Sequence, residues 1–220
     1  MLSNMASTTP SGAARHVNRM ILTATFCFSA VSLLGLLILA GGPGPTHSAL
    51  AGIVFGISLL LCSLCSYLYN MRETSRYRWL LRYFDHSSIF LLIAGTYTPF
   101  VIHGVPGPFG IGLMVWVWGL ALLGIALKLL LRGRHDRVFV VLYLALGWLF
   151  LSAIGQFIHL NPLPSLIFLA VGGFAYTIGA IIYGRDIGNW TDPVWHGCVL
   201  AGASTHFIAV VLLIVDNQVV

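Results

Sequence analysis

Charged residues are scarce in this sequence. Only 8% of its 220 residues are Asp, Glu, Lys or Arg, whereas 58% are hydrophobic, and the mean hydropathy is +0.93. Soluble domains carry about 25% charged residues, so this composition excludes a soluble globular domain. Because each membrane-crossing helix needs about 20 apolar residues, a chain of this length accommodates about seven crossings and no separate soluble domain.

Lysine is nearly absent and cysteine is rare. The one lysine, Lys128, lies near the end of the fourth apolar run rather than in the last one, where a retinal protein needs its Schiff-base lysine. All four cysteines fall within apolar runs, and the CxxC of Cys62 and Cys65 has no flanking strand pattern. This setting favours packing over redox chemistry. Retinal chemistry is therefore excluded, and nothing in the sequence implies a disulfide framework.

What the chain does contain is a series of seven long apolar runs. Breaks such as GGPGPT, HGVPGP and HLNPLP separate them and carry turn residues. The pattern predicts an all-α, seven-transmembrane-helix bundle. The runs are Met20–Ala40, His47–Tyr69, Asp85–Ile102, Phe109–Leu131, Val138–Ile158, Ser165–Tyr183 and Pro193–Val215.

Arginines occur before the first run and in every second break. The breaks between them contain no Lys or Arg, so the positive-inside rule predicts a cytoplasmic N-terminus and an outer C-terminus. A G-protein-coupled receptor has the opposite orientation, and no G protein is implied. The formal net charge of +5 reports this topology rather than a nucleic-acid partner. The arginines are Arg15 and Arg19, then Arg72, Arg76, Arg78 and Arg82, then Arg132, Arg134 and Arg137, and last Arg185.

The predicted domain organisation is simple. Residues 1–19 form a flexible cytoplasmic leader, residues 20–215 a single membrane domain, and residues 216–220 a short outer tail. The first run is too long for a cleaved signal core of about 7–15 residues. Gly52 and Gly56 form a GxxxG, which favours packing within the bundle, although a homo-oligomer is also possible.

Polar residues gather at the predicted cytoplasmic ends of three runs. Ser66 and Asn70 end the second run one helical turn apart, Asp85 begins the third, and Asp192 and His196 begin the last one turn apart. Carboxylates and imidazoles held by separate helices are suitable zinc ligands, and zinc can acidify a bound water for hydrolysis. The sequence thus predicts a cavity that opens at this end.

Each of these residues also has a simpler interpretation. Asp192 precedes Pro193 and could be a helix N-cap, and His86 could be an interfacial histidine bonded locally. Thr96 and His206 extend the polar stripe toward the midplane, but His206 could equally be a core histidine bonded to a neighbouring helix. A proton or ion pathway along this stripe is disfavoured because no acidic residue continues it outward.

Three segments resemble one family. The stretches FDHSSIFLLIAGTYTPF, VGGFAYTIGAIIYG and WHGCVLAGASTHFIAV, within residues 59–215, are similar to the hemolysin III family, bacterial relatives of the progestin and adipoQ receptors. The resemblance implies a cytoplasmic zinc site. Its ligands are a His closing an S-x-x-x-H on the second helix and an H-x-x-x-H opening the seventh, with an Asp of the third helix holding the zinc-bound water. The wider superfamily includes ceramide-cleaving amidases, and the founding bacterial proteins are associated with haemolysis and membrane lipid balance.

Four positions of this chain match that pattern. The resemblance makes Asp85 the water-orienting residue, Ser66 the serine of the second-helix motif, His196 the second His of the seventh helix, and His206 a further His deeper in that helix.

Other positions depart from the pattern. Asn70 stands where the second-helix His belongs, and Asp192 stands where the first His of the seventh helix belongs. In the first-helix motif only Asn18 fits, while the other places hold Arg15, Ile21 and Leu22. An oxygen-rich set of Asn70, Asp85, Asp192 and His196 could hold zinc weakly, accept manganese or magnesium, or bind no metal.

Two functions follow. The first is a metal-dependent hydrolase of a lipid amide or ester in a bacterial cytoplasmic (inner) membrane, with Asp85 and Ser66 in catalysis. The second is a non-enzymatic membrane protein of lipid sensing, membrane homeostasis or cytolytic pore activity that has lost the zinc chemistry. Membrane lipid is the expected partner of both.

Overall fold

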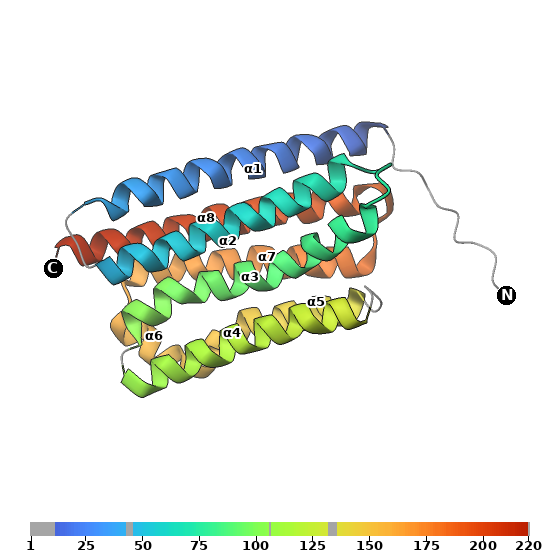
Figure 1. Ribbon diagram of the computed structural model, residues 1–220. Helices are drawn as coiled ribbons and strands as arrows, with labels where there is room; N and C mark the ends of the chain where they lie inside the picture. Colours follow the sequence, from blue (N-terminus) through green and yellow to red (C-terminus); the bar gives the residue numbers. More distant parts are fainter. Residues whose placement is uncertain (1–11, 43–45, 106, 132–135, 220) are drawn as a thin grey trace.

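The protein is a bundle of long helices that lie side by side (Figure 1). The computed structural model describes residues 12–42, 46–105, 107–131 and 136–219, and within these ranges every regular element is a helix. Seven of the described helical segments are long and apolar enough to cross a membrane, which confirms the predicted fold class. In chain order the elements are α1 (Gly12–Ala40), α2 (Thr46–Met71), α3 (Arg78–Gly104), α4 (Gly107–Leu130), α5 (Asp136–Gly147), η1 (Trp148–Ala153), α6 (Ile154–Leu160), α7 (Leu163–Arg185), η2 (Gly188–Trp190) and α8 (Thr191–Val219).

Helix α3 lies at the centre and contacts α2, α4, α5, α6 and α8. Its side chains Phe90, Tyr97 and Phe100 are buried, and Phe55 of α2 is fully buried beside them. Gly124 of α4 allows a close approach, because a Cβ at this position would overlap the Phe90 ring. Large apolar side chains face outward on the peripheral helices, as expected for a lipid-exposed surface.

The fifth crossing is a broken helix, made of α5, η1 and α6 in succession. The Tyr97 hydroxyl lies 2.9 Å from the Leu146 carbonyl oxygen and 3.0 Å from that of Gly147, and it accepts the Phe150 N–H at 2.7 Å. These bonds satisfy backbone groups that the break would otherwise leave unpaired in hydrocarbon. The sequence predicted one uninterrupted run here, because apolar composition carries no signal for a helix break.

Two helices begin well before the apolar runs that predicted them. Helix α1 begins at Gly12 rather than Met20, and α3 begins at Arg78 rather than Asp85. Hydropathy misses these turns because they carry polar and basic side chains, whose long stems reach along the helix to the interface. Asp85 therefore lies two turns inside α3 rather than at its head. Of the predicted leader, residues 1–11 lie outside the described residues.

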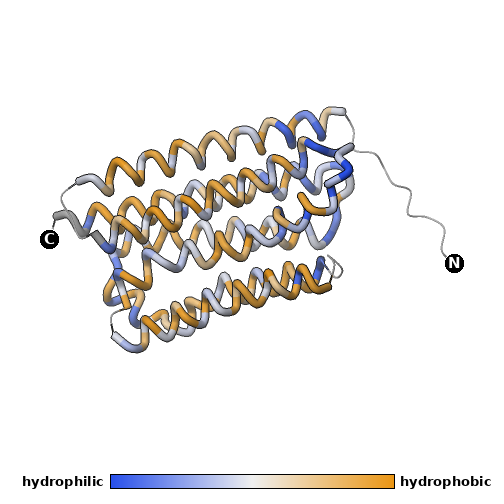
Figure 2. The backbone as a smooth tube through the Cα atoms, in the orientation of Figure 1, coloured by the Kyte–Doolittle hydropathy of each residue, from blue (hydrophilic) through white to orange (hydrophobic). Residues whose placement is uncertain are grey.

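Polar residues concentrate at one end of the bundle (Figure 2). This end holds the start of α1, the α2–α3 connection and the α7–α8 connection (Figure 1). Every arginine of the described chain lies there, so we name it the basic end. Helix α8 ends at the opposite end, as an odd number of crossings requires.

Candidate functional site

A polar cavity of about 240 Å³ opens within the bundle toward the basic end. Helices α1, α2, α3, α4, α5, α7 and α8 all contribute to its wall. The polar side chains that line it are Thr25, Ser63, Ser66, Asn70, Arg78, Arg82, Asp85, His86, Lys128, Asp136, Asp192 and His196. The predicted gathering of polar groups from α2, α3 and α8 is therefore a property of the folded chain.

His196 of α8 is the centre of a hydrogen-bonded network at this cavity. Its Nδ1 lies 2.6 Å from Asn18 Oδ1 of α1, and its Nε2 lies 3.4 Å from Ser66 Oγ of α2. Since an amide oxygen only accepts, Nδ1 carries the proton and Nε2 of the neutral ring is the acceptor. Asn70 Nδ2 donates to the Ser66 carbonyl oxygen at 2.9 Å, and Asn70 Oδ1 accepts from Asn18 Nδ2 at 3.5 Å. The network ties three helices together around a buried imidazole.

Two carboxylates flank this network. Asp85 is half-buried in the cavity wall, and the Ser66 hydroxyl and His86 are its neighbours. Asp192 lies in the first turn of α8, where it lines the cavity yet is exposed to solvent. This combination places Asp192 at the rim of the cavity. It is not the N-cap that the sequence offered as an alternative, because α8 already begins at Thr191.

A second cluster, of opposite charges, joins α3, α4 and α5. Lys128 Nζ lies 2.7 Å from Asp136 Oδ1 and 4.3 Å from the centre of the Phe139 ring, and its side chain is only 1% exposed. Arg82 forms a short contact with the other Asp136 oxygen, and His86 Nδ1 lies 3.6 Å from Oδ1. A buried ammonium in a membrane helix is costly, so this pairing is what makes the position of Lys128 tolerable.

Thr96 and His206 lie elsewhere, on a second and largely apolar cavity of about 120 Å³. The Thr96 hydroxyl donates to the Leu92 carbonyl oxygen of its own helix at 2.8 Å. His206 Nε2 lies 3.1 Å from the Leu169 carbonyl oxygen, and its ring packs edge-on against Tyr176. Of the two interpretations of His206, this geometry favours the histidine bonded to a neighbouring helix.

The two cavities are neighbours. Five side chains line both of them, namely Ile89, Leu92, Val140, Tyr143 and Trp195. A polar compartment at the basic end thus adjoins an apolar compartment nearer the middle of the bundle, with these five residues at their boundary.

The polar cavity does not fit the zinc site that the resemblance implies. Among the described residues no group of three His, Cys, Asp or Glu side chains could hold a metal ion. His196 is the only histidine of the three expected ligand positions, and its Nδ1 is engaged by Asn18. Protein zinc sites use three or four ligands and favour nitrogen and sulfur, so one imidazole with flanking amides is an incomplete set.

The residues of the charged cluster at the cavity, Arg82, Lys128 and Asp136, were not singled out from the sequence as site residues. A signal was present, since Lys128 near the end of one crossing and Asp136 at the start of the next are opposite charges on adjacent helices. Asn18 was noted only as a remnant of the first-helix motif. Its contact with His196 joins residues 178 positions apart, for which spacing holds no signal.

Comparison with known proteins gives a consistent picture. The family described as "Haemolysin-III related" matches residues 15–207. The chain is 34% identical over 182 residues to "Hemolysin-3 homolog" of Bacillus subtilis (strain 168), covering 83% of this chain and 85% of that protein. It is 32% identical over 189 residues to "Hemolysin-3" of Bacillus cereus, covering 86% of each.

A more distant similarity reaches animal proteins. "Monocyte to macrophage differentiation factor" of Homo sapiens is 26% identical over 127 residues, which cover 57% of this chain and 52% of that protein. No solved structure matches the chain.

Proposed function

Because the chain belongs to the haemolysin III family, we propose that it is a non-enzymatic, multi-pass member that binds a membrane lipid in its paired cavities. The lipid headgroup would occupy the polar cavity and an acyl chain the apolar one. The observation that carries this proposal is the incomplete ligand set around His196, in which Asn70 and Asp192 stand where the family pattern has histidines.

Metal content tests the non-enzymatic part. We expect protein purified without chelator to hold far less than about one transition-metal ion per chain. Restoring the pattern with Asn70→His and Asp192→His together should raise zinc to about one per chain. The matched control, Asn70→Gln with Asp192→Asn, supplies no imidazole and should stay at the wild-type value. Near-stoichiometric zinc in the wild type would overturn the proposal.

Lipid retention tests the binding part separately. Ile89 lines both cavities, so the larger side chain of Ile89→Trp should occupy space at their boundary and displace a co-purifying lipid. Ile89→Leu keeps the side-chain volume and should not displace it. Lipid extraction and mass spectrometry of the two purified variants provide the measurement. Equal lipid profiles in the wild type and both variants would contradict lipid binding at the boundary of the two cavities.

A metal-dependent lipid hydrolase is the second candidate. It is favoured by one observation, that Asp85, Asp192 and His196 all line one cavity. It requires stoichiometric metal in the wild type and release of fatty acid from a lipid amide or ester, both lost in His196→Ala. If either the metal or the fatty-acid release is absent, the hydrolase is rejected and lipid binding remains the proposed function.

Cytolytic pore formation by a single chain is disfavoured. Phe55, Phe90 and Phe100 are buried at the centre of the bundle, and the polar lining of the cavity stays near the basic end. A water-filled path would need polar groups along the whole length of the bundle.

For localisation, we propose a bacterial cytoplasmic membrane with the basic end in the cytoplasm. The Lys- and Arg-free loops at the other end support this orientation. An N-terminal fluorescent-protein fusion should be fluorescent, and a C-terminal alkaline phosphatase fusion should be active. Activity of phosphatase fused instead to the α2–α3 connection would contradict the orientation.

A further inference from the structure

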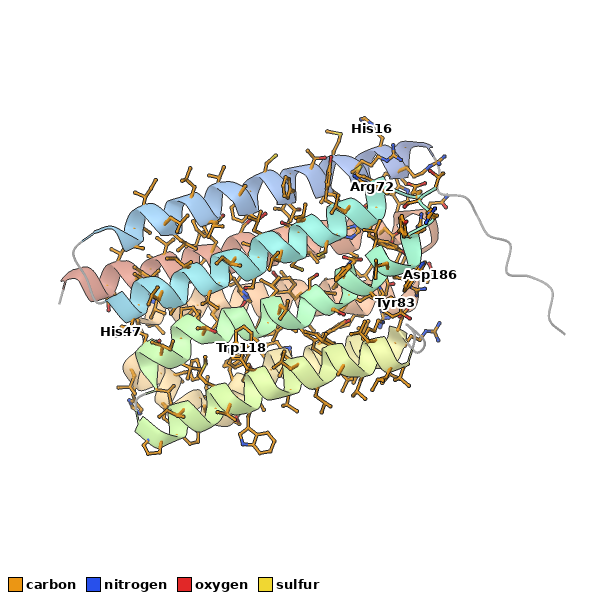
Figure 3. All side chains as sticks on the ribbon, in the orientation of Figure 1. His16, His47, Arg72, Tyr83, Trp118 and Asp186 are labelled. Atoms are coloured by element: carbon orange, nitrogen blue, oxygen red, sulfur yellow. The ribbon has the colours of Figure 1, made fainter. Side chains whose placement is uncertain are left out.

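The α2–α3 connection and the first turns of α3 form a surface patch that the cavities do not use. Arg72, Arg76 and Tyr77 precede α3, and Trp79 and Phe84 lie in its first two turns. All five side chains are exposed, with Tyr77 50%, Trp79 62% and Phe84 54% exposed. We name these five residues the aromatic–arginine patch. Figure 3 shows Arg72 and the neighbouring Tyr83 at the same end of the bundle, opposite His47.

Two of the patch's aromatic rings have defined contacts. Trp79 packs edge-on against Tyr83 with ring centres 5.9 Å apart. The Arg76 guanidinium lies 4.6 Å from the centre of the Tyr77 ring. Exposed Trp and Tyr at a helix end are typical of the membrane interface, where an apolar ring lies at headgroup level. We therefore expect the arginines of the patch to lie at the depth of lipid phosphates.

Within the described part of the chain, the acidic side chains near the patch pair with other cations. Nearby Glu73 pairs with Arg19, and Asp136 pairs with Arg82, Lys128 and His86. None of the ion pairs among the described residues uses Arg72 or Arg76. An uncompensated guanidinium presents several donors in a planar fork that suits phosphate oxygens.

We propose that the aromatic–arginine patch is a binding site for an anionic membrane phospholipid. Arg72 and Arg76 bind its phosphate, while Trp79 and Phe84 lie beside its acyl chains. The occupant is anionic because a zwitterionic lipid would bring its own cation to two guanidinium groups that form no ion pair with the described residues. The site lies on the outer surface of the bundle and is independent of any lipid within the cavities.

The test uses the whole chain in vesicles of phosphatidylcholine with one-fifth phosphatidylglycerol. In one preparation the phosphatidylglycerol carries brominated acyl chains. In the other, an equal mole fraction of brominated phosphatidylcholine is used instead. Bromine quenches nearby tryptophan, and the difference between wild type and Trp79→Phe isolates the Trp79 signal. We expect the brominated phosphatidylglycerol to quench this signal more strongly, with a preference of about fivefold.

Matched variants separate a local site from general charge. Arg72→Ala with Arg76→Ala should abolish the preference, and Arg72→Lys with Arg76→Lys should retain part of it. Arg137→Ala with Arg185→Ala removes the same charge from exposed positions at the same end and should leave the preference unchanged. Circular dichroism and monodisperse elution show that each variant is folded.

Three results would overturn the proposal. Equal quenching by both lipids in the wild type would show that the patch does not select an anionic headgroup. An equal loss of the phosphatidylglycerol preference in Arg72→Ala with Arg76→Ala and in Arg137→Ala with Arg185→Ala would show a general effect of charge. Absence of quenching by either lipid would show that protein, from a second copy or another chain, covers the patch.

Discussion

His196 and His206 lie on the same helix, ten residues apart, in opposite surroundings. His196 faces the side-chain amide of Asn18 and the hydroxyl of Ser66 at a polar cavity. His206 packs against Tyr176 and bonds a backbone carbonyl at an apolar one. Both are about equally buried, at 8% exposure. What differs is the chemistry of the helices that pack against each ring.

The comparison extends to how each cavity is held. Charged and amide groups from separate helices pair around the polar cavity, with Lys128 and Asp136 as the most buried pair. Close packing and hydrogen bonds among uncharged groups hold the apolar one. We therefore expect the polar cavity to be sensitive to charge and the apolar cavity to be sensitive to shape.

The largest expected effect breaks the charged half of this comparison. Lys128→Met should lower the free energy of unfolding by about 2–3 kcal/mol, because it leaves the Asp136 carboxylate without its most buried partner. Arg82→Met, which removes a side chain that is 45% exposed, should cost less than about 1 kcal/mol. Unfolding in detergent, followed by circular dichroism, measures both variants.

A double variant sharpens this prediction. Lys128→Met with Asp136→Asn removes both charges, so much of the lost stability should return. If the double variant were as unstable as the sum of its single changes, the pair would not be coupled and the charged half of the comparison would fail.

A change of shape should affect the apolar half next. Gly172→Ala places a Cβ against the His206 imidazole and 2.7 Å from Thr205 Oγ1, so α7 and α8 must separate. We expect a cost of about 1–3 kcal/mol and a lower thermal midpoint. At the adjacent Gly173 the nearest atom, in Trp148, is 3.8 Å away, so Gly173→Ala is the matched control. Similar midpoints for the two variants would contradict tight packing at His206.

The smallest effect concerns the broken fifth crossing beside the apolar cavity. Tyr97→Phe removes the acceptor of the Phe150 N–H, which lies 2.7 Å from the hydroxyl oxygen. An unpaired buried donor costs about 1–2 kcal/mol, so stability should fall and amide exchange near Phe150 should accelerate. Faster exchange throughout the protein, rather than near the break, would argue against this specific role.

The sequence predicted much of the fold because hydropathy acts along the chain. Seven apolar runs were enough to place seven crossings, and the runs beginning at His47 and Phe109 agree closely with α2 and α4. The start of α3 was predicted seven residues late, since its first turns carry Arg78 and Arg82. The break at Trp148–Ala153 was missed because the Tyr97 hydroxyl that bonds its backbone groups comes from another helix.

The candidate site was predictable in its location but not in its pairings. The predicted topology, with the runs alternating in direction, put Ser66, Asp85 and His196 at one level, and they line one cavity. Thr96 and His206 were extended from the same stripe by helical spacing, yet they line the other cavity. Spacing gives the direction of a side chain on its own helix and says nothing of the neighbour it meets.

The sequence by itself determined that this chain is a seven-crossing membrane protein of the haemolysin III family with polar groups at its basic end. Only the tertiary structure decided that His196 meets Asn18, that Lys128 meets Asp136, and that two cavities adjoin. The physical reason is that burial in a membrane depends on each segment's own composition. A hydrogen bond or an ion pair depends on the depth and rotation of two helices at once.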